Sequence, residues 1–245
     1  MTMEKGKRMS IRAKLGIFIV VLLVLDQAVK IWIKTHMMIG DEFNVIGDWF
    51  KIHFIENNGM AFGMELGGEW GKMMLSLFRI MAVTLIGWYI FHLLKQKAPK
   101  GVIFSCALIF CGAIGNIIDS MFYGMIFNES YSQVATLFPP GGGYSSFLHG
   151  KVVDMLYFPI YEGFLPDWIP IWGGEFFVFF RPVFNFADSY ITIGVLILLL
   201  FYRKFFSSKK VATTQKGTFK APFIFFMLRV DDINRKQVFT FNTFV

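Results

Sequence analysis

Four long apolar runs dominate the chain and are separated by segments of mixed character. The runs cover residues of about 15–34, 73–94, 101–118 and 185–202. A membrane-spanning helix needs about 20 consecutive, mostly apolar residues, and each run meets or approaches this length. The pattern therefore predicts four transmembrane helices.

Two of the intervening segments have distinct patterns. Residues 43–64 alternate apolar and polar side chains around Phe50, Ile52 and Phe54, and a glycine-bearing stretch follows. This alternation predicts a small β-element. Residues 125–150 are rich in Asn, Ser, Tyr, Pro and Gly, a composition that is typical of a flexible insertion.

A third segment, residues 156–182, is dense in Phe, Tyr and Trp. Such aromatics suit either the level of the lipid headgroups or a tightly packed small outer domain. The tail at 206–245 has one short apolar stretch, which is too short to span a membrane. We assign this tail no function.

The composition favours a membrane protein. Of the 245 residues, 55% are hydrophobic and 17% are charged, whereas soluble domains have about 45–50% apolar and about 25% charged residues. A net charge of +7 could suggest nucleic acid, but the Lys and Arg residues cluster beside the apolar runs, where they orient a membrane protein. We therefore expect contact with membrane lipid and no binding of nucleic acid.

The basic residues also predict an orientation. They are Lys5, Lys7, Arg8, Arg12 and Lys14 before the first run, Lys95, Lys97 and Lys100 after the second, and Arg203, Lys204, Lys209 and Lys210 after the fourth. With four spans these segments share one side, which the positive-inside rule makes the cytoplasm. Both termini are then cytoplasmic, and segments 35–72 and 119–184 are extracytoplasmic.

Histidines and cysteines give no support for a metal site. The four histidines are scattered, and the chain has no Cys-x-x-Cys pattern or combined Cys/His ligand set. A metal site needs several convergent ligands. We therefore expect neither a metal nor another cofactor.

Polar faces interrupt two of the predicted spans at their extracytoplasmic ends. In the third span the face consists of Gly112, Asn116 and Asp119. In the fourth span it consists of Asn185, Asp188, Ser189 and Thr192. Each set recurs at helical spacing, and ionisable groups in a span are costly and indicate function by default.

Two further carboxylates, Asp26 and Asp154, each allow more than one interpretation. Asp26 and Lys30 are four residues apart in the first span, so they form either a structural ion pair or a support for the site or the substrate path. Asp154 lies between apolar residues and would ordinarily belong to a strand end or turn. If Asp154 met Asp188, the two carboxyl groups would share a proton and could act as general acid and general base.

Ion transport and a purely structural role are the alternatives. A proton or cation transporter could use Asp26, Asp119 and Asp188, but its polar residues would continue toward the cytoplasmic side. The cytoplasmic halves of the third and fourth runs, 101–110 and 195–201, are nearly all apolar. This favours a site open to one face. A structural scaffold would have no reason to gather carboxylates at one depth.

Five short motifs occur in an order that resembles lipoprotein signal peptidase, also called signal peptidase II, a bacterial aspartic protease family of the inner membrane. They are DQAVK (26–30), NNGMAF (57–62), GAIGNIID (112–119), GKVVDM (150–155) and FNFADSYITIG (184–194). Each motif is weak alone. Five of them in order, spread over most of residues 15–205, are specific.

The resemblance implies a fold and a reaction. The fold is an all-α membrane protein of four transmembrane helices with a small extracytoplasmic β-element, here in residues 1–205, together with long insertions. The substrate is a prolipoprotein that carries a diacylglyceryl group, cut just before the lipidated cysteine without metal or organic cofactor. We expect a monomer with its active site near the extracytoplasmic face.

The resemblance also implies roles for individual residues. The catalytic pair is Asp154 and Asp188. The substrate-binding or supporting residues are Asn57, Gly59, Asn116, Asp119, Asn185, Ala187, Asp26 and Lys30.

The chain departs from the family pattern in two ways. The family has Arg directly after the Asp that corresponds to Asp119, whereas this chain has Ser120. A hydroxyl cannot replace the donors of a guanidinium, and Arg181 is a weak candidate for a substitute cation. The separations from Asp119 to Asp154 and from Asp154 to Asp188 are also long, which we interpret as outer-surface insertions.

Overall fold

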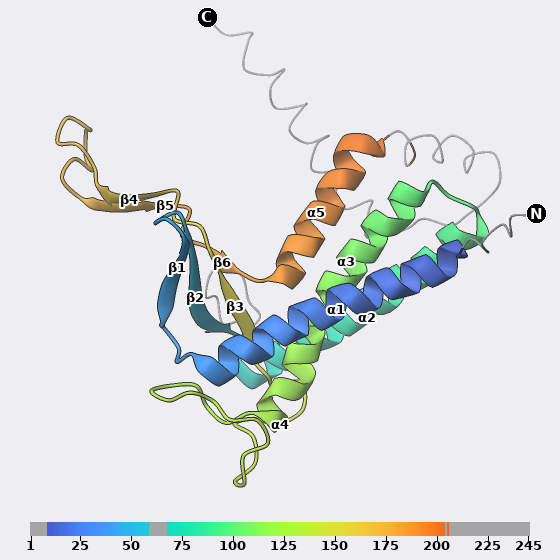
Figure 1. The fold of residues 1–245 in the computed structure, drawn as a ribbon, viewed down its shortest axis with the longest axis horizontal. Coiled ribbons are helices and arrows are strands. Elements are labelled where there is room, and N and C mark those ends of the chain that lie inside the picture. Colours follow the sequence, from blue (N-terminus) through green and yellow to red (C-terminus); the bar gives the residue numbers. More distant parts are fainter. Residues whose placement is uncertain (1–8, 59–67, 204, 206–245) are drawn as a thin grey trace, which may run out of the picture. The chain divides into compact units, whose positions relative to one another are not determined.

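The computed structural model describes residues 9–58, 68–203 and 205. Gly59, most of the motif at 57–62 and the tail at 206–245 therefore lie outside the described residues. Residues up to Leu198 belong to one compact unit, which contains the described strands and helices apart from the end of the final helix (Figure 1).

Four helices account for the apolar runs. They are α1 (Ile11–His36), α2 (Gly68–Lys95), α3 (Lys100–Ile118) and α5 (Phe186–Phe201). Among the described residues, the first three are long and apolar enough to cross a membrane, whereas the 16-residue α5 is apolar but shorter. Ser10 begins α1 by accepting a hydrogen bond from the Ala13 amide.

The third helix extends further than its apolar run. After Ile118 the chain continues through a π-helical turn, η2 (Asp119–Tyr123), and a short helix, α4 (Gly124–Ile126). The end predicted for the third span, about residue 118, coincides with the end of α3, but helical structure continues for about two turns into the segment that starts at 119. Such π-helical turns are frequent at functional sites, and this one starts at Asp119.

Beside the helices lies a four-stranded antiparallel sheet. Its strands are β1 (Glu42–Ile46), β2 (Phe50–Asn57), β3 (Val152–Tyr157) and β6 (Val183–Phe184), in that order. Gly47, with φ of +51°, allows the tight turn from β1 to β2. The predicted β-element is confirmed, but the expected all-α class understates the strands because β3 and β6 come from the second outer segment.

The core of the unit forms where the sheet meets the end of α1. Phe54 of β2, Val153 and Met155 of β3, and Ile33 of α1 are almost completely buried together with Phe127. Asp154 lies between two of these residues, and every residue of β3 except the last, Tyr157, is buried. Burial on both faces fixes the position of β3 and hence that of its carboxylate.

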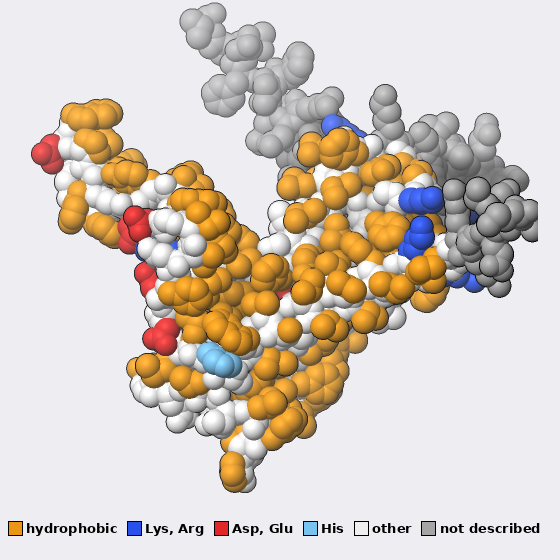
Figure 2. Space-filling view, in the orientation of Figure 1, with side chains coloured by type: hydrophobic (Ala, Val, Ile, Leu, Met, Phe, Trp, Pro, Cys, Tyr) orange, Lys and Arg blue, Asp and Glu red, His pale blue; other side chains and the backbone are white. Residues whose placement is uncertain are grey.

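Most of the aromatic segment 156–182 forms a separate hairpin of β4 (Tyr161–Phe164) and β5 (Phe176–Phe179), while its first two residues belong to β3. Figure 1 shows it projecting beyond the sheet, and Figure 2 shows hydrophobic side chains covering it as they cover the helices. Phe164 is 71% exposed, Trp168 80% and Ile171 87%. The prediction of a tightly packed outer domain is therefore wrong for this hairpin.

The insertion at 125–150 is tied to the body of the protein by a buried ion cluster. Lys34 of α1 pairs with Glu56 of β2 and donates to the Ser130 hydroxyl over 2.7 Å. Lys151 lies 3.3 Å from Glu56 and 3.0 Å from Glu129. Burial alone would raise the pKa of Glu56, but the charges of Lys34 and Lys151 lower it below its usual value. This segment, predicted to be a flexible insertion, is therefore anchored at several points.

Glycines let the helices approach each other closely near the polar residues. A Cβ atom at Gly112 would lie 2.1 Å from the Ala187 carbonyl oxygen, and one at Gly115 would lie 2.5 Å from an Asp26 carboxylate oxygen. Only glycine fits at such distances. The small-residue face predicted for the third span therefore brings α1, α3 and α5 together.

Candidate active site

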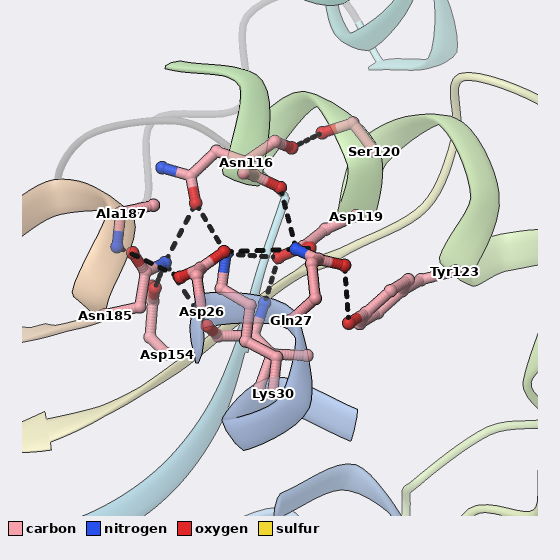
Figure 3. A network of polar contacts seen from close by, with 12 residues as sticks. Asp26, Gln27, Lys30, Asn116, Asp119, Ser120, Tyr123, Asp154, Asn185 and Ala187 are labelled. Carbon is pink, nitrogen blue, oxygen red and sulfur yellow. Dashed lines mark hydrogen bonds and ion pairs between the residues drawn. The ribbon is translucent and has the colours of Figure 1, made fainter. Parts of the chain in front are cut away.

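Polar side chains from α1, α3, η2, β3 and the residue before α5 converge where the sheet meets the helices (Figure 3). One centre of this cluster is the Lys30 ammonium group. It lies 3.1 Å from Asp26 Oδ2 and 2.9 Å from Asp119 Oδ2, and it donates to Asn116 Oδ1 over 2.9 Å. Lys30, Asp26 and Asp119 are buried, so each charge is compensated within the protein.

Asp26 has a second role in addition to its ion pair. Its Oδ1 accepts a hydrogen bond of 3.0 Å from the backbone N–H of Ala187, the second residue of α5. The first N–H groups of a helix have no partner within the helix, so a carboxylate there stabilises the helix start. Asp26 therefore belongs to a buried ion pair and also holds the start of α5.

Gln27 and Tyr123 complete this layer. The Gln27 amide donates to Asp119 Oδ1 over 2.9 Å and to the Gly115 carbonyl over 3.2 Å. The Tyr123 hydroxyl donates to Gln27 Oε1 over 3.1 Å. Tyr123 was not a sequence candidate, because it lies beyond the predicted end of the third span. Tyr123 lies seven residues after Asn116, so a prediction of a longer helix would have placed both residues on one face.

Asn185 is the second centre and links two carboxylates. Its amide nitrogen donates to Asp154 Oδ1 over 2.7 Å and to Asn116 Oδ1 over 3.0 Å. Its Oδ1 accepts from the Asp188 backbone N–H over 2.9 Å, so Asn185 also caps α5. Asn185 is fully buried. The residue therefore fixes β3 and the start of α5 relative to each other.

Asp154 and Asp188 lie on either side of Asn185. Asp154 is 2% exposed, and its Oδ2 accepts from the Asn57 amide over 3.2 Å. Asp188 is half-buried, its Oδ1 accepts from the Asn116 amide over 2.8 Å, and its Oδ2 accepts from the Asn185 backbone N–H over 3.4 Å. Three asparagines thus hold two carboxyl groups, which come from segments 34 residues apart.

The electrostatic environment of Asp154 is unusual for an aspartate. Burial, and next the charge of Asp188, raise the pKa of Asp154 to about 7, although Asn57, Lys30 and Asn185 act in the opposite direction. Near neutral pH this carboxyl group is protonated for part of the time. A carboxyl group in that state can donate a proton as well as accept one.

The raised pKa predicts a pH dependence of stability. An unfolded Asp has a pKa of about 3.9, whereas Asp154 has a folded pKa of about 7. Because the folded protein holds this proton more tightly, the contribution of Asp154 to the free energy of unfolding decreases as pH rises from about 4 to about 7, by at most about 1.4 kcal/mol per pH unit. Asp154→Asn should remove this contribution.

This prediction can be checked by thermal unfolding of the full chain in detergent across that pH range. The control is Asp48→Asn, because Asp48 is an exposed residue of the turn after β1. The control should keep the pH dependence of the parent. An Asp154→Asn variant with the same pH dependence as the parent would contradict the assignment of the proton to Asp154.

Other sequence candidates lie at the edge of this cluster. Ser189 donates to the Asn185 backbone carbonyl over 3.0 Å, so it contributes to the start of α5 and contacts neither carboxylate through this bond. Ser120 is buried, and its hydroxyl donates to the Asn116 carbonyl over 3.1 Å. Arg181, considered as a substitute cation, is exposed near the base of the hairpin.

Arg79 of α2 is a further residue near the site that was not among the sequence candidates. Its Nη1 lies 3.4 Å from the Ser120 hydroxyl oxygen. Arg79 stands in the middle of the second apolar run, and an ionisable residue in such a run is itself a sign of function. The sequence carries that signal, although none of the five motifs contains it.

Comparison with known proteins agrees with this geometry. The family model described as signal peptidase (SPase) II matches residues 18–204. A lipoprotein signal peptidase of Porphyromonas gingivalis is 55% identical over 185 residues, which cover 75% of this chain and 80% of that protein. One of Amoebophilus asiaticus is 38% identical over 180 residues, covering 72% of each chain.

A solved structure is also similar. It is a bacterial membrane enzyme determined by the in meso method at 1.9 Å resolution, with 27% sequence identity and a TM-score of 0.50, covering 78% of this chain and 94% of that one. The family match at residues 18–204 extends over the helices and the sheet that carry the cluster. The chain therefore belongs to the signal peptidase II family.

Proposed function

We propose that this chain is a membrane endopeptidase that removes the signal peptide from diacylglyceryl-modified prolipoproteins by cutting before the lipidated cysteine. The observation that carries the proposal is the buried arrangement in which Asn185 bonds Asp154 on one side and Asp188 on the other. Family membership supplies the reaction class. The aspartic type of catalysis is our inference from this arrangement.

The chemistry follows from the different environments of the two carboxyl groups. Burial raises the pKa of Asp154 to about 7, so we assign Asp154 as the general acid and the half-buried Asp188 as the general base. Asp188 takes a proton from a water molecule as that water attacks the scissile carbonyl carbon, while Asp154 gives its proton to the carbonyl oxygen. The product of this step is a tetrahedral diol.

The diol then breaks down with the protons moving back. Asp188 gives its proton to the leaving nitrogen as the carbon–nitrogen bond breaks, and a diol hydroxyl returns a proton to Asp154. Both carboxyl groups return to their starting protonation states, and these proton transfers need neither a metal nor an organic cofactor. Asn57, Gly59 and Asn116 are proposed to hold the substrate backbone, while Ala187, Asp119, Asp26 and Lys30 support the site.

The depth of the site suits a substrate with lipid chains. The 16 residues of α5 extend ~24 Å, less than the ~30 Å of the bilayer hydrocarbon. If α5 is the fourth span and Arg203 marks the cytoplasmic lipid boundary, the start of α5 and hence Asp188 lie below the outer lipid boundary. The lipid chains of the substrate could then stay in the bilayer while its peptide enters the site.

Charge distribution supports an extracytoplasmic site with cytoplasmic termini. Figure 2 shows Lys and Arg side chains gathered at the end of the helices near the N-terminus and Asp and Glu side chains at the sheet. The positive-inside rule assigns the basic end to the cytoplasm. The exposed aromatic hairpin at 156–182 would then meet the outer lipid headgroups, and a monomer suffices for the site.

A transporter lacks comparable support. It would need polar groups along a path through the helices. At the end of the bundle opposite the sheet, the cavity between α1, α2 and α3 has almost only apolar walls, including Leu15, Ile19, Ile90 and Phe110. Polar residues gathered near the sheet, with apolar walls at the other end, fit a hydrolase better than a transporter.

The test is cleavage of matched prolipoproteins by the full chain in proteoliposomes. One substrate carries the diacylglyceryl group on its lipobox cysteine, and the control has Ser at that position and carries no lipid. We expect mass spectrometry to show a product that begins with the modified cysteine for the first substrate alone. Absence of cleavage, or equal cleavage of both substrates, would reject the proposal.

A further inference from the structure

The balance of charge around the proposed pair points to a residue outside the five motifs. Four carboxyl groups gather at the site, namely Asp26, Asp119, Asp154 and Asp188, whereas Lys30 is the cation that contacts two of them. Buried carboxylates without a compensating cation are costly. A second positive charge near this cluster would therefore have a large effect on which carboxyl group keeps a proton.

Arg79 is in a position to supply that charge. It belongs to α2 (Gly68–Lys95), whose face is held against the 145–150 loop by the buried Ser76 hydroxyl, which donates to the Leu148 carbonyl over 3.2 Å. Residues 76 and 79 are three apart and share this face. From this face the guanidinium of Arg79 reaches Ser120 of η2, the residue that follows Asp119 of the carboxylate cluster.

Ser120 connects Arg79 to the rest of the site. Its hydroxyl donates its one proton to the Asn116 carbonyl, so its oxygen is left to accept from Arg79 Nη1 at 3.4 Å. The Asn116 side chain in turn donates to Asp188 Oδ1. Ser120 thus stands where the family motif has Arg and provides an acceptor for a guanidinium that arrives from another helix.

We propose that Arg79 is the positioning cation of this site, held by Ser120, and that its charge keeps Asp188 as the ionised member of the pair while the proton stays on Asp154. This inference rests on the proposed function and deepens it, because it assigns the general base and the general acid. It also explains how the site has this cation although Ser120 stands where the family motif has Arg, since the cation comes from α2.

Removal of the charge is expected to change the pH profile as well as the rate. In Arg79→Met, kcat for the lipidated prolipoprotein should fall at least about tenfold, and the acidic limb of the pH–rate profile should move up by about 1 unit or more, because an opposite charge favours ionisation of a carboxyl group. Arg79→Lys keeps the charge and should keep the parental limb. Arg181→Met, at an exposed arginine, is the matched control and should match the parent.

Other charged groups around the pair remain in place in these variants. They are Lys30 and Asp26 of α1, and Asp119 of η2. The neutral neighbours Asn57, Asn116 and Asn185 also remain. A shift of the acidic limb in Arg79→Met therefore reports the guanidinium charge. A parental acidic limb in Arg79→Met would overturn the proposal even if the rate fell, because a purely structural residue affects the rate alone.

A relocated cation gives a second test. The double variant Arg79→Ser, Ser120→Arg moves the guanidinium to the position that the family motif gives it. We expect it to recover most of the kcat lost in Arg79→Ser, together with the parental acidic limb. A double variant no more active than Arg79→Ser would overturn the proposal, and this test applies equally if Arg79→Met does not fold.

One measurement separates failure of this inference from failure of the proposed function. Infrared spectroscopy of the full chain in detergent follows the carbonyl band of protonated carboxyl groups as pH rises and needs no turnover. Arg79→Met should shift the midpoint of this titration upward by about 1 pH unit. An unchanged midpoint overturns the role of Arg79 whether or not the parent cleaves prolipoprotein, while a shifted midpoint in a protein without cleavage rejects the proposed function alone.

Discussion

Asp154→Asn and Asp188→Asn are each expected to lower kcat for cleavage of the lipidated prolipoprotein by at least about 100-fold, because general acid–base groups contribute about 10²–10⁴-fold. Asn keeps the size of Asp but can neither give up nor take the catalytic proton. The proposed step needs one proton donor and one acceptor, so loss of either member stops it. KM should change less than kcat, because the substrate is held mainly by other groups.

The measurement is the rate of appearance of the cleaved product under saturating substrate for each variant. Asp48→Asn, which changes an exposed carboxylate in the turn after β1, should match the parent. Thermal unfolding of each purified variant shows whether it is folded. If either folded variant kept more than about a tenth of the parental kcat, the pair would not be the acid and base of the reaction.

The distribution of apolar and polar residues predicted much of the helical part of the site. The 3.6-residue period put Asn116 and Asp119 on one face and Asn185 and Asp188 on another, and both faces meet in the structure. The same pattern predicted that Asp188 lies at the start of the fourth helix, and α5 does begin at Phe186. Local periodicity suffices here because each face lies on a single helix.

Local periodicity could not predict site residues that meet through the pairing of strands far apart in the sequence. Asp154 enters the site because β3 pairs with β2, with Asp154 opposite Ile55 across nearly 100 residues of sequence. Nothing in the local pattern of either strand specifies that register. The resemblance to the family motifs supplied Asp154, whereas Arg79, which lies outside those motifs, came only from the packing of α2 beside Ser120.

The aromatic segment shows a different limit. Both a lipid-facing hairpin and a packed domain require abundant Phe, Tyr and Trp, so composition could not distinguish them. The deciding observation is exposure: Trp168 and Ile171 have little contact with the rest of the described chain. A two-stranded hairpin such as β4–β5 has too few layers to bury its own side chains.

Lys30→Met is expected to lower the free energy of unfolding by about 3–5 kcal/mol, because removing one member of a buried ion network leaves its partners uncompensated. Lys30 compensates Asp26 and Asp119, all three being buried. Met fills a similar volume, so the loss reports charge and hydrogen bonding more than packing. Denaturant unfolding of the full chain in mixed micelles measures it.

Lys51→Met is the matched control, because Lys51 also pairs with two carboxylates, Glu42 at 3.4 Å and Glu162 at 3.3 Å. Those partners are 43% and 40% exposed, so water replaces the lost pairs and the expected change is ~1 kcal/mol or less. Adding Asp119→Asn to Lys30→Met should recover part of the lost stability, since one of the uncompensated charges is then gone. Equal losses for Lys30→Met and Lys51→Met would mean that the Lys30 network does not hold α1, α3 and α5 together.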